Sequence, residues 1–120
     1  MTTMGFRPHE RIKEPGAFRR AFDRRRWESD AVMTIYGVEN GLDHPRLGIS
    51  VSRKKVKTAA ARNRLKRLYR EAFRLSKAEL PTGLDLVIVP RQTVPRFADV
   101  RRSLPALARD LERRIRSRKP

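Results

Sequence analysis

The chain has 120 residues, and its 30 Lys and Arg against 13 Asp and Glu give a formal net charge of +17. The absence of cysteine excludes a disulfide scaffold, a thiolate metal site and a cysteine nucleophile. This length and charge predict one basic domain with a polyanionic partner, nucleic acid ahead of a membrane surface or an acidic protein segment.

Residues 1–13 are predicted to form a flexible basic arm, followed by a single domain over residues 14–115 and a basic tail over residues 116–120. The N-terminal stretch lacks the apolar segment of a signal peptide, and no run of residues is apolar enough for a transmembrane helix. We therefore expect a cytoplasmic protein that has no membrane partner.

The first half of the domain is predicted to contain a helix and two strands. The segment EPGAFRRAFDRRRW is typical of a short helix, with Pro15 in its first turn and Phe18 and Phe22 on one face. Residues 31–38 are rich in strand-forming residues, and residues 46–52 alternate apolar with small or polar side chains. Because a turn-forming loop joins these two strands, we expect them to pair as a hairpin.

The second half is predicted to contain two helices separated by a strand. Residues 59–75 have helical periodicity, with a narrow apolar stripe opposite a basic side. The stripe consists of Ala61, Leu65, Leu68, Ala72 and Leu75. Phe73 lies outside this stripe, among the basic side chains. Residues 84–90 form a buried strand that ends in a proline, and the last helix either begins near Ser103 or kinks at Pro105.

These elements, with two or three strands between the first two helices, predict an α+β fold, of order αβββαβα when there are three, with helices packed on one face of a small sheet. Asp85 is the one acid within an apolar strand. We expect it to mark the exposed face of that strand or to pair with an arginine, in preference to forming half of a metal site.

No catalytic constellation is present in the sequence. The two histidines, His9 and His44, lie in loop-like segments without a second histidine at metal-ligand spacing, and we interpret both as surface residues. Motifs of serine hydrolases, zinc proteases, phosphate-binding loops and dinucleotide sites do not occur. The residues alone therefore indicate neither a self-sufficient enzyme nor a metal, cofactor or small-molecule site.

A basic window over residues 53–74 is the strongest functional signal, with ten basic residues and one acid. Solvated helix faces usually mix both signs at a spacing of four residues, so a window of one sign favours contact with a polyanion over a merely exposed face. Asn63 lies between two of the arginines. Its amide either hydrogen bonds to a nucleotide or a backbone group, or is simply exposed.

A second candidate group consists of the aromatic residues Phe18, Phe22 and Tyr36. Packing into the core is the usual role of aromatic side chains spaced four residues apart. The alternative is a platform on which unpaired bases stack, next to the arginines of the same helix. The sequence leaves both alternatives open.

The segment RNRLKRLYREAFR, preceded by RLGISVSRKK, resembles the protein subunit of bacterial ribonuclease P. The motif of that family reads R-N-R-x-K-R-x-x-R-E-x-F. The matching residues are Arg62, Asn63, Arg64, Lys66, Arg67, Arg70, Glu71 and Phe73. The resemblance extends over roughly residues 10–115, from the first helix to the last.

The resemblance implies a small α/β sandwich with a sheet of about four strands, three helices and a left-handed βαβ crossover, although right-handed crossovers are the rule. It also implies that a catalytic RNA, with its Mg²⁺, removes the 5′ leader of precursor tRNA. The protein would bind both RNAs and supply neither a catalytic residue nor a metal ligand.

The resemblance assigns residues to two surfaces. The implied face for the catalytic RNA comprises Arg53, Lys54, Lys55, Arg62, Asn63, Arg64, Lys66, Arg67 and Arg70. The implied cleft for the leader is lined by Phe18, Phe22 and Tyr36. Two other functions remain: a basic ribosomal or DNA-associated protein, and a nuclease that acts alone. Asn63 and the aromatic group favour the ribonuclease P reading, since a purely electrostatic binder needs neither.

Overall fold

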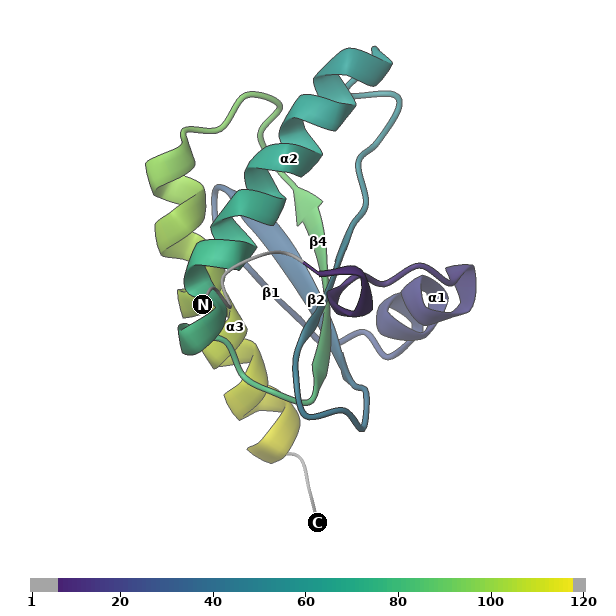
Figure 1. Cartoon of the computed structure of the whole chain (residues 1–120), viewed down its shortest axis with the longest axis vertical. Coiled ribbons are helices and arrows are strands. Elements are labelled where there is room, and N and C mark those ends of the chain that lie inside the picture. The colour runs from purple at the N-terminus through teal and green to yellow at the C-terminus, as the bar shows by residue number, and fades with distance from the viewer. Residues whose placement is uncertain (1–6, 118–120) are drawn as a thin grey trace.

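The computed structural model describes residues 7–117, so residues 1–6 of the predicted arm and residues 118–120 of the predicted tail lie outside the described residues. The elements follow the predicted order αβββαβα, with two short 3₁₀ helices added (Figure 1). Their bounds are η1 (Pro8–Glu10), α1 (Pro15–Asp23), β1 (Trp27–Ser29), β2 (Met33–Glu39), β3 (Arg46–Ile49), α2 (Ala59–Ser76), η2 (Lys77–Glu79), β4 (Leu84–Pro90) and α3 (Phe97–Ser117). The predicted α+β class is confirmed.

Strand β4 lies inside the sheet, with β2 on one side and β3 on the other, and β1 is at the edge beside β2. It pairs antiparallel with β2 and parallel with β3. The predicted hairpin of residues 31–38 and 46–52 is therefore wrong, because β4 separates these strands. All side chains from Leu84 to Ile88 are buried, and a strand buried on both faces belongs inside a sheet, with α2 as the crossover from β3.

Helices cover both faces of the sheet, α2 and α3 on one and α1 on the other (Figure 1). Side chains alternate along a strand, so Ile35 and Leu86 join the large core with α2 and α3. Val38 and Val87 join a smaller core with α1. The prediction that the helices pack on one face is wrong for α1. Because β2 and β4 carry apolar side chains on both faces, each face needs a cover.

Helix α2 begins after Thr58, whose hydroxyl accepts a hydrogen bond from the backbone N–H of Ala61 at 3.1 Å. Its buried residues are Leu65, Tyr69, Ala72, Phe73 and Ser76. Phe73 is fully buried, so its predicted place outside the core stripe is wrong. The stripe is rotated from the predicted one because the large rings of Tyr69 and Phe73 both pack into the core.

Residues 7–13, the described part of the predicted flexible arm, pack along β3. The side chain of Ile12 is buried, and its backbone N–H donates to the carbonyl of Leu47 at 2.9 Å. Glu10 is also buried and pairs with Lys77 at 2.8 Å. This segment differs from the predicted arm because an apolar side chain and a paired carboxylate attach it to the domain.

Helix α3 begins at Phe97, earlier than the predicted start near Ser103, and contains Pro105. Pro105 has no N–H to donate to the carbonyl of Arg101, which weakens the helix locally. The Pro105 ring is buried together with most of the apolar side chains of α3, so packing offsets that loss. None of the described helices is long and apolar enough to cross a membrane.

Asp85 is fully buried in β4 and pairs with Arg46 of β3. Arg46 Nε and Nη2 donate to Asp85 Oδ1 and Oδ2, each at 2.8 Å, and Asn40 Nδ2 donates to Oδ1 at 3.0 Å. The hydrogen bonds to Asp85 raise the pKa of Arg46. The predicted pairing with an arginine is confirmed, and the alternative of an exposed strand face is wrong.

Candidate nucleic-acid interface

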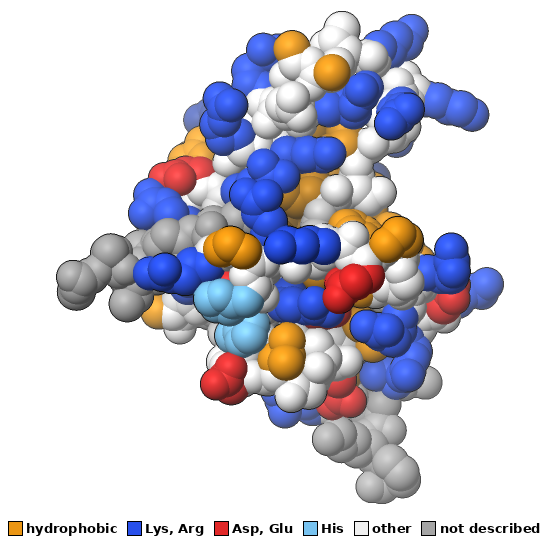
Figure 2. Space-filling view, turned by 45° about the vertical axis from the view of Figure 1, so that its right-hand side comes forward, with side chains coloured by type: hydrophobic (Ala, Val, Ile, Leu, Met, Phe, Trp, Pro, Cys, Tyr) orange, Lys and Arg blue, Asp and Glu red, His pale blue; other side chains and the backbone are white. Residues whose placement is uncertain are grey.

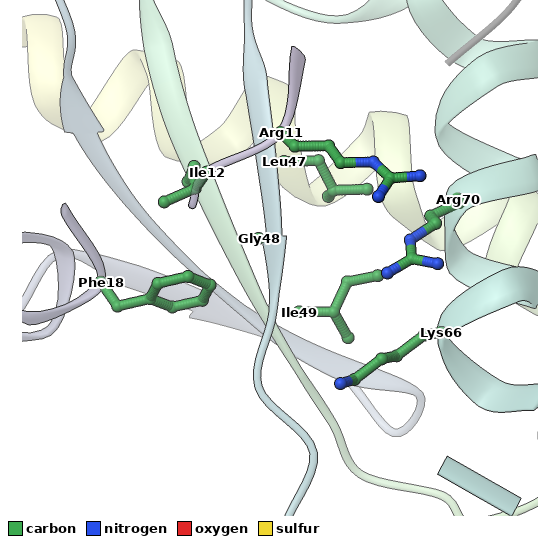
Figure 3. A pocket seen from close by; sticks show the side chains of 8 residues that line it. All are labelled: Arg11, Ile12, Phe18, Leu47, Gly48, Ile49, Lys66 and Arg70. Carbon is green, nitrogen blue, oxygen red and sulfur yellow. The ribbon is translucent and has the colours of Figure 1, made fainter. Parts of the chain in front are cut away.

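A hollow of about 160 Å³ opens between α1, β3 and α2 (Figure 3). Its lining consists of Arg11, Ile12, Phe18, Leu47, Gly48, Ile49, Lys66 and Arg70. Phe18 approaches from α1 on one side of β3, and Lys66 and Arg70 approach from α2 on the other side (Figure 3). An aromatic ring and two cationic groups therefore border one space, which is the combination that a single nucleic-acid strand needs.

Gly48 lets Phe18 lie close to the floor of this hollow. A Cβ atom at position 48 would stand 2.7 Å from Phe18 Cζ and 3.3 Å from Ile12 Cβ. Any larger residue would therefore push the ring away from β3. The sequence contained a signal for this contact, because an isolated glycine inside a strand often marks a close approach.

The basic side chains that line the hollow, Arg11, Lys66 and Arg70, bring several positive charges into one small space. Burial, together with the guanidinium groups of Arg11 and Arg67, lowers the pKa of Arg70. Figure 3 shows the side chains of Arg11 and Arg70 reaching toward one another. An anion placed here would offset the repulsion. Arg11 was not among the predicted site residues, because it lies in the segment predicted to be a flexible arm, and no local sequence pattern indicates that this segment approaches α2.

Phe22 and Tyr36 lie on the same face of the sheet as Phe18 but do not line the hollow. Their rings meet edge to face, with centroids 4.8 Å apart and planes inclined by 72°. All three aromatic side chains are half-buried against the small core with α1. They therefore help to hold α1 on the sheet and still keep part of their surface exposed.

The loop before α2 presents Arg53, Lys54 and Lys55 to solvent. The hydroxyl of Ser52 accepts hydrogen bonds from the backbone N–H groups of Lys54 at 3.2 Å and Lys55 at 3.3 Å, which holds the loop in a turn. Figure 2 shows Lys and Arg side chains gathered over the upper part of this face, where the loop and the start of α2 lie.

Arg62 holds this loop against the helix. Its Nη1 atom donates to the carbonyl of Val56 at 2.9 Å and to that of Lys57 at 3.1 Å. The family motif implied only RNA contact for Arg62, and no sequence signal indicated this second role. A guanidinium with five donors can hold both carbonyls and still offer donors to a phosphate.

The other motif residues point in different directions around α2. Asn63 and Arg67 are exposed, and the side-chain amide of Asn63 forms no hydrogen bond within the described part of the chain. Arg64 borders a separate apolar hollow beside Val94 and Pro95. The basic helix therefore presents its side chains to two sides, one of which is shared with the aromatic hollow.

The two histidines of the chain lie close together, away from the hollow. Within residues 7–117, no group of three or more His, Asp or Glu side chains is arranged to hold a metal ion. The rings of His9 and His44 meet edge to face at 5.0 Å, and His44 Nδ1 lies 3.0 Å from an Asp43 carboxylate oxygen. The hydrogen bond from His44 lowers the pKa of Asp43.

Comparison with known proteins decides the family. Residues 6–112 match the family model described as Ribonuclease P. The chain belongs to the bacterial ribonuclease P protein family. It is similar to the ribonuclease P protein component of Pseudomonas putida, with 44% identity over 93 residues that cover 77% of this chain and 69% of the relative. It is also similar to the ribonuclease P protein component of Sodalis glossinidius, with 40% identity over 78% of each chain.

Solved structures of ribonuclease P proteins share the fold. The protein from Thermotoga maritima superimposes with a TM-score of 0.74 at 34% identity, over 83% of this chain and 96% of that one. The protein from Staphylococcus aureus superimposes with a TM-score of 0.72 at 30% identity, over 84% of this chain and 94% of that one. The four-stranded mixed sheet with three helices is therefore a ribonuclease P protein fold, as the sequence motif implied.

Proposed function

We propose that this chain, as the protein component of ribonuclease P, binds the RNA subunit of that ribonucleoprotein endonuclease and the 5′ leader of precursor tRNA in the cytoplasm. The RNA subunit hydrolyses the bond that joins the leader to the mature tRNA. The observation that carries this proposal is the hollow in which Phe18 faces Lys66 and Arg70, because a leader needs stacking and phosphate contacts together.

The leader passes beside α1, over the part of that sheet face where aromatic side chains remain partly exposed. One base stacks on Phe18, and Lys66 and Arg70 contact the phosphates beside it. Phe22 and Tyr36 extend the partly exposed aromatic surface along the same face. The bound phosphates offset the like-charge repulsion that, together with burial, lowers the pKa of Arg70. Mature tRNA, which has no leader, leaves this face empty.

The RNA subunit binds the loop before α2 and the exposed sides of that helix. The residues assigned to this contact are Arg53, Lys54, Lys55, Arg62, Asn63, Arg64, Lys66, Arg67 and Arg70. Lys66 and Arg70 belong both to this surface and to the hollow proposed for the leader. Each phosphate contact releases a counterion. A plot of the logarithm of affinity against the logarithm of salt concentration should therefore have a negative slope of about 0.7–0.9 per contact.

We assign the chemical step to the RNA subunit and its Mg²⁺ ions, with no catalytic group from the protein. The residue set supports this assignment, since the described side chains offer no cluster of three metal-ligating groups. The single buried carboxylate of β4, Asp85, is held by Arg46 and is not among the residues that line the hollow. The protein therefore acts by holding both RNAs in position.

Reconstitution tests this function directly. The purified protein is mixed with an in vitro transcribed bacterial ribonuclease P RNA and a precursor tRNA at low Mg²⁺ concentration, and the 5′ ends of the products are mapped. Accurate cleavage that needs both components is expected. Cleavage by the protein alone would show a protein nuclease. Tight binding to unrelated RNAs without stimulation, across RNA subunits of several lineages, would show a general basic RNA-binding protein.

A further inference from the structure

Four residues form a row across the whole sheet on the face that α1 covers. Trp27 of β1 pairs in register with Tyr36 of β2, Tyr36 pairs with Val87 of β4, and Val87 pairs with Gly48 of β3. Register partners on neighbouring strands place their side chains on the same face, about 4.5–5.5 Å apart at Cβ. The row therefore begins at the floor of the hollow, under Phe18, and ends at the opposite edge of the sheet.

Trp27 occupies the outer end of this row. Its neighbour Glu28 points to the other face, because Glu28 Oε2 accepts a hydrogen bond from Arg114 Nε of α3 at 2.6 Å. The alternation of side chains along β1 therefore directs Trp27 to the face of Tyr36. The Trp27 side chain is 48% exposed, so a large part of its surface is available to a ligand.

Three arginines directly precede Trp27 in the sequence. Arg24, Arg25 and Arg26 form the turn from α1 into β1, and Arg25 has a left-handed backbone with φ of 55°. Arg24 and Arg25 are exposed, and none of the three forms an ion pair with another described residue. An exposed indole that follows three arginines without ion pairs among residues 7–117 resembles the combination of ring and cation at the hollow.

We propose that Trp27 is a second base-stacking position, which binds a leader nucleotide farther from the cleavage site than the nucleotide at Phe18. The proposal rests on the function proposed above, and it adds a specific length of leader that the protein contacts. The residues assigned to the RNA subunit lie on α2 and in the loop before it, and α2 contributes Lys66 and Arg70 to the hollow beside the edge strand β3, whereas Trp27 lies at the β1 edge. The leader therefore enters at the hollow and reaches Trp27 last.

The width of the sheet sets the minimum length of the leader. Three strand spacings separate Gly48 from Trp27, which is about 14 Å, and because Gly48 and Val87 are buried under Phe18 and α1, a leader that passes beside α1 must span at least this distance. One stacked nucleotide advances about 3.4 Å along a strand, so a base at Trp27 must lie several positions beyond the base at Phe18. Short leaders fill the hollow alone, and longer leaders also reach the indole.

The chain carries its own probe for this contact, because Trp27 is its one tryptophan. The holoenzyme, reconstituted with the RNA subunit, is titrated with precursor tRNAs whose leaders are lengthened one nucleotide at a time. We expect the indole fluorescence to be quenched only above a threshold leader length. Beyond that length, Trp27→Ala should weaken precursor binding by about 5-fold or more, and Trp27→Phe should retain most of the affinity.

A matched control and a positive control separate the outcomes. Leu42→Ala removes a side chain of similar exposure, 41%, outside the row, and should leave binding unchanged at every leader length. In one outcome, Phe18→Ala weakens leader binding, but neither the effect of Trp27→Ala on binding nor the indole fluorescence depends on leader length. The Trp27 proposal is then overturned and the proposed function stands. If the wild-type holoenzyme does not distinguish precursor from mature tRNA, both are overturned.

Discussion

The ring of Phe18 lies directly against the backbone of Gly48, where a Cβ atom would stand 2.7 Å from the ring. This contact joins α1 to β3 at the floor of the hollow. The position of the Phe18 ring therefore depends on the absence of a side chain at Gly48. The shape of the hollow therefore depends on the backbone at Gly48 as much as on the aromatic ring.

Replacing Gly48 with Ala should displace the Phe18 ring. We expect the free energy of unfolding to fall by about 1–3 kcal/mol, as in other overpacked sites, and leader binding to weaken with it. Urea unfolding and precursor binding measure the two effects. Gly16→Ala is the matched control, since a Cβ there meets nothing within 4 Å. Gly37→Ala, which would push against Leu111 on the other face, should destabilise the fold without a specific loss of leader binding.

The half-buried aromatic side chains of α1 should matter more for precursor than for mature tRNA. Phe18→Ala and Phe22→Ala are each expected to weaken binding of leader-bearing precursor by about 1–3 kcal/mol, with little change for mature tRNA. Competitive binding of the two RNAs to the holoenzyme measures the difference. An equal loss for both RNAs would show that the rings serve only to pack α1. Phe18→Leu keeps apolar volume without a flat ring, and should behave like the Ala variant in binding.

The Arg46–Asp85 pair should be asymmetric toward mutation. Arg46→Met leaves the fully buried Asp85 carboxylate with only Asn40 as a partner, and should cost about 3–5 kcal/mol of stability. Asp85→Asn should cost less, because Arg46 keeps some exposure and has Glu14 at 3.6 Å. Denaturant unfolding of the two variants tests this order. Equal costs would mean that Asp85 gains water or another partner when Arg46 is lost.

An exposed arginine of α2 should contribute to RNA binding, whereas an ion-paired arginine of α3 should not. Arg67→Gln removes an exposed cation and should flatten the salt dependence of binding to the RNA subunit by about 0.7–0.9 in slope. Arg113→Gln removes the same charge from α3, where Arg113 pairs with Asp110, and should leave the slope unchanged. A similar change of slope in both variants would indicate that net charge alone drives binding.

Arg62→Gln should have a second effect that Arg67→Gln lacks. It breaks the hydrogen bonds to the carbonyls of Val56 and Lys57, so the loop before α2 should become more mobile. Amide hydrogen exchange in this loop should be faster in Arg62→Gln than in Arg67→Gln. Unchanged exchange would show that Ser52 and the helix start hold the loop without Arg62.

Much of the candidate site was visible in the sequence because its signals are local. The basic side chains of α2 follow one another within a single helix, and their motif implied both the family and the RNA partner. Phe18 and Phe22 share a helix face because they are four residues apart. These relationships depend on helical spacing alone, so no knowledge of distant contacts was needed.

The amino-acid sequence by itself determined the order of the elements apart from β1, the burial of β4 and the one-signed surface of α2, because each follows from periodicity within a short segment. Only the tertiary structure decided that β4 separates β2 from β3 and that Arg11 and Arg70 line the same hollow. It also decided that Trp27 lies in one row with Gly48 across the sheet. Those arrangements depend on which strands pair and in what register. Which strands pair depends on contacts between segments that are far apart in the sequence. The pairing that forms is the one that buries the apolar side chains on both faces of the sheet.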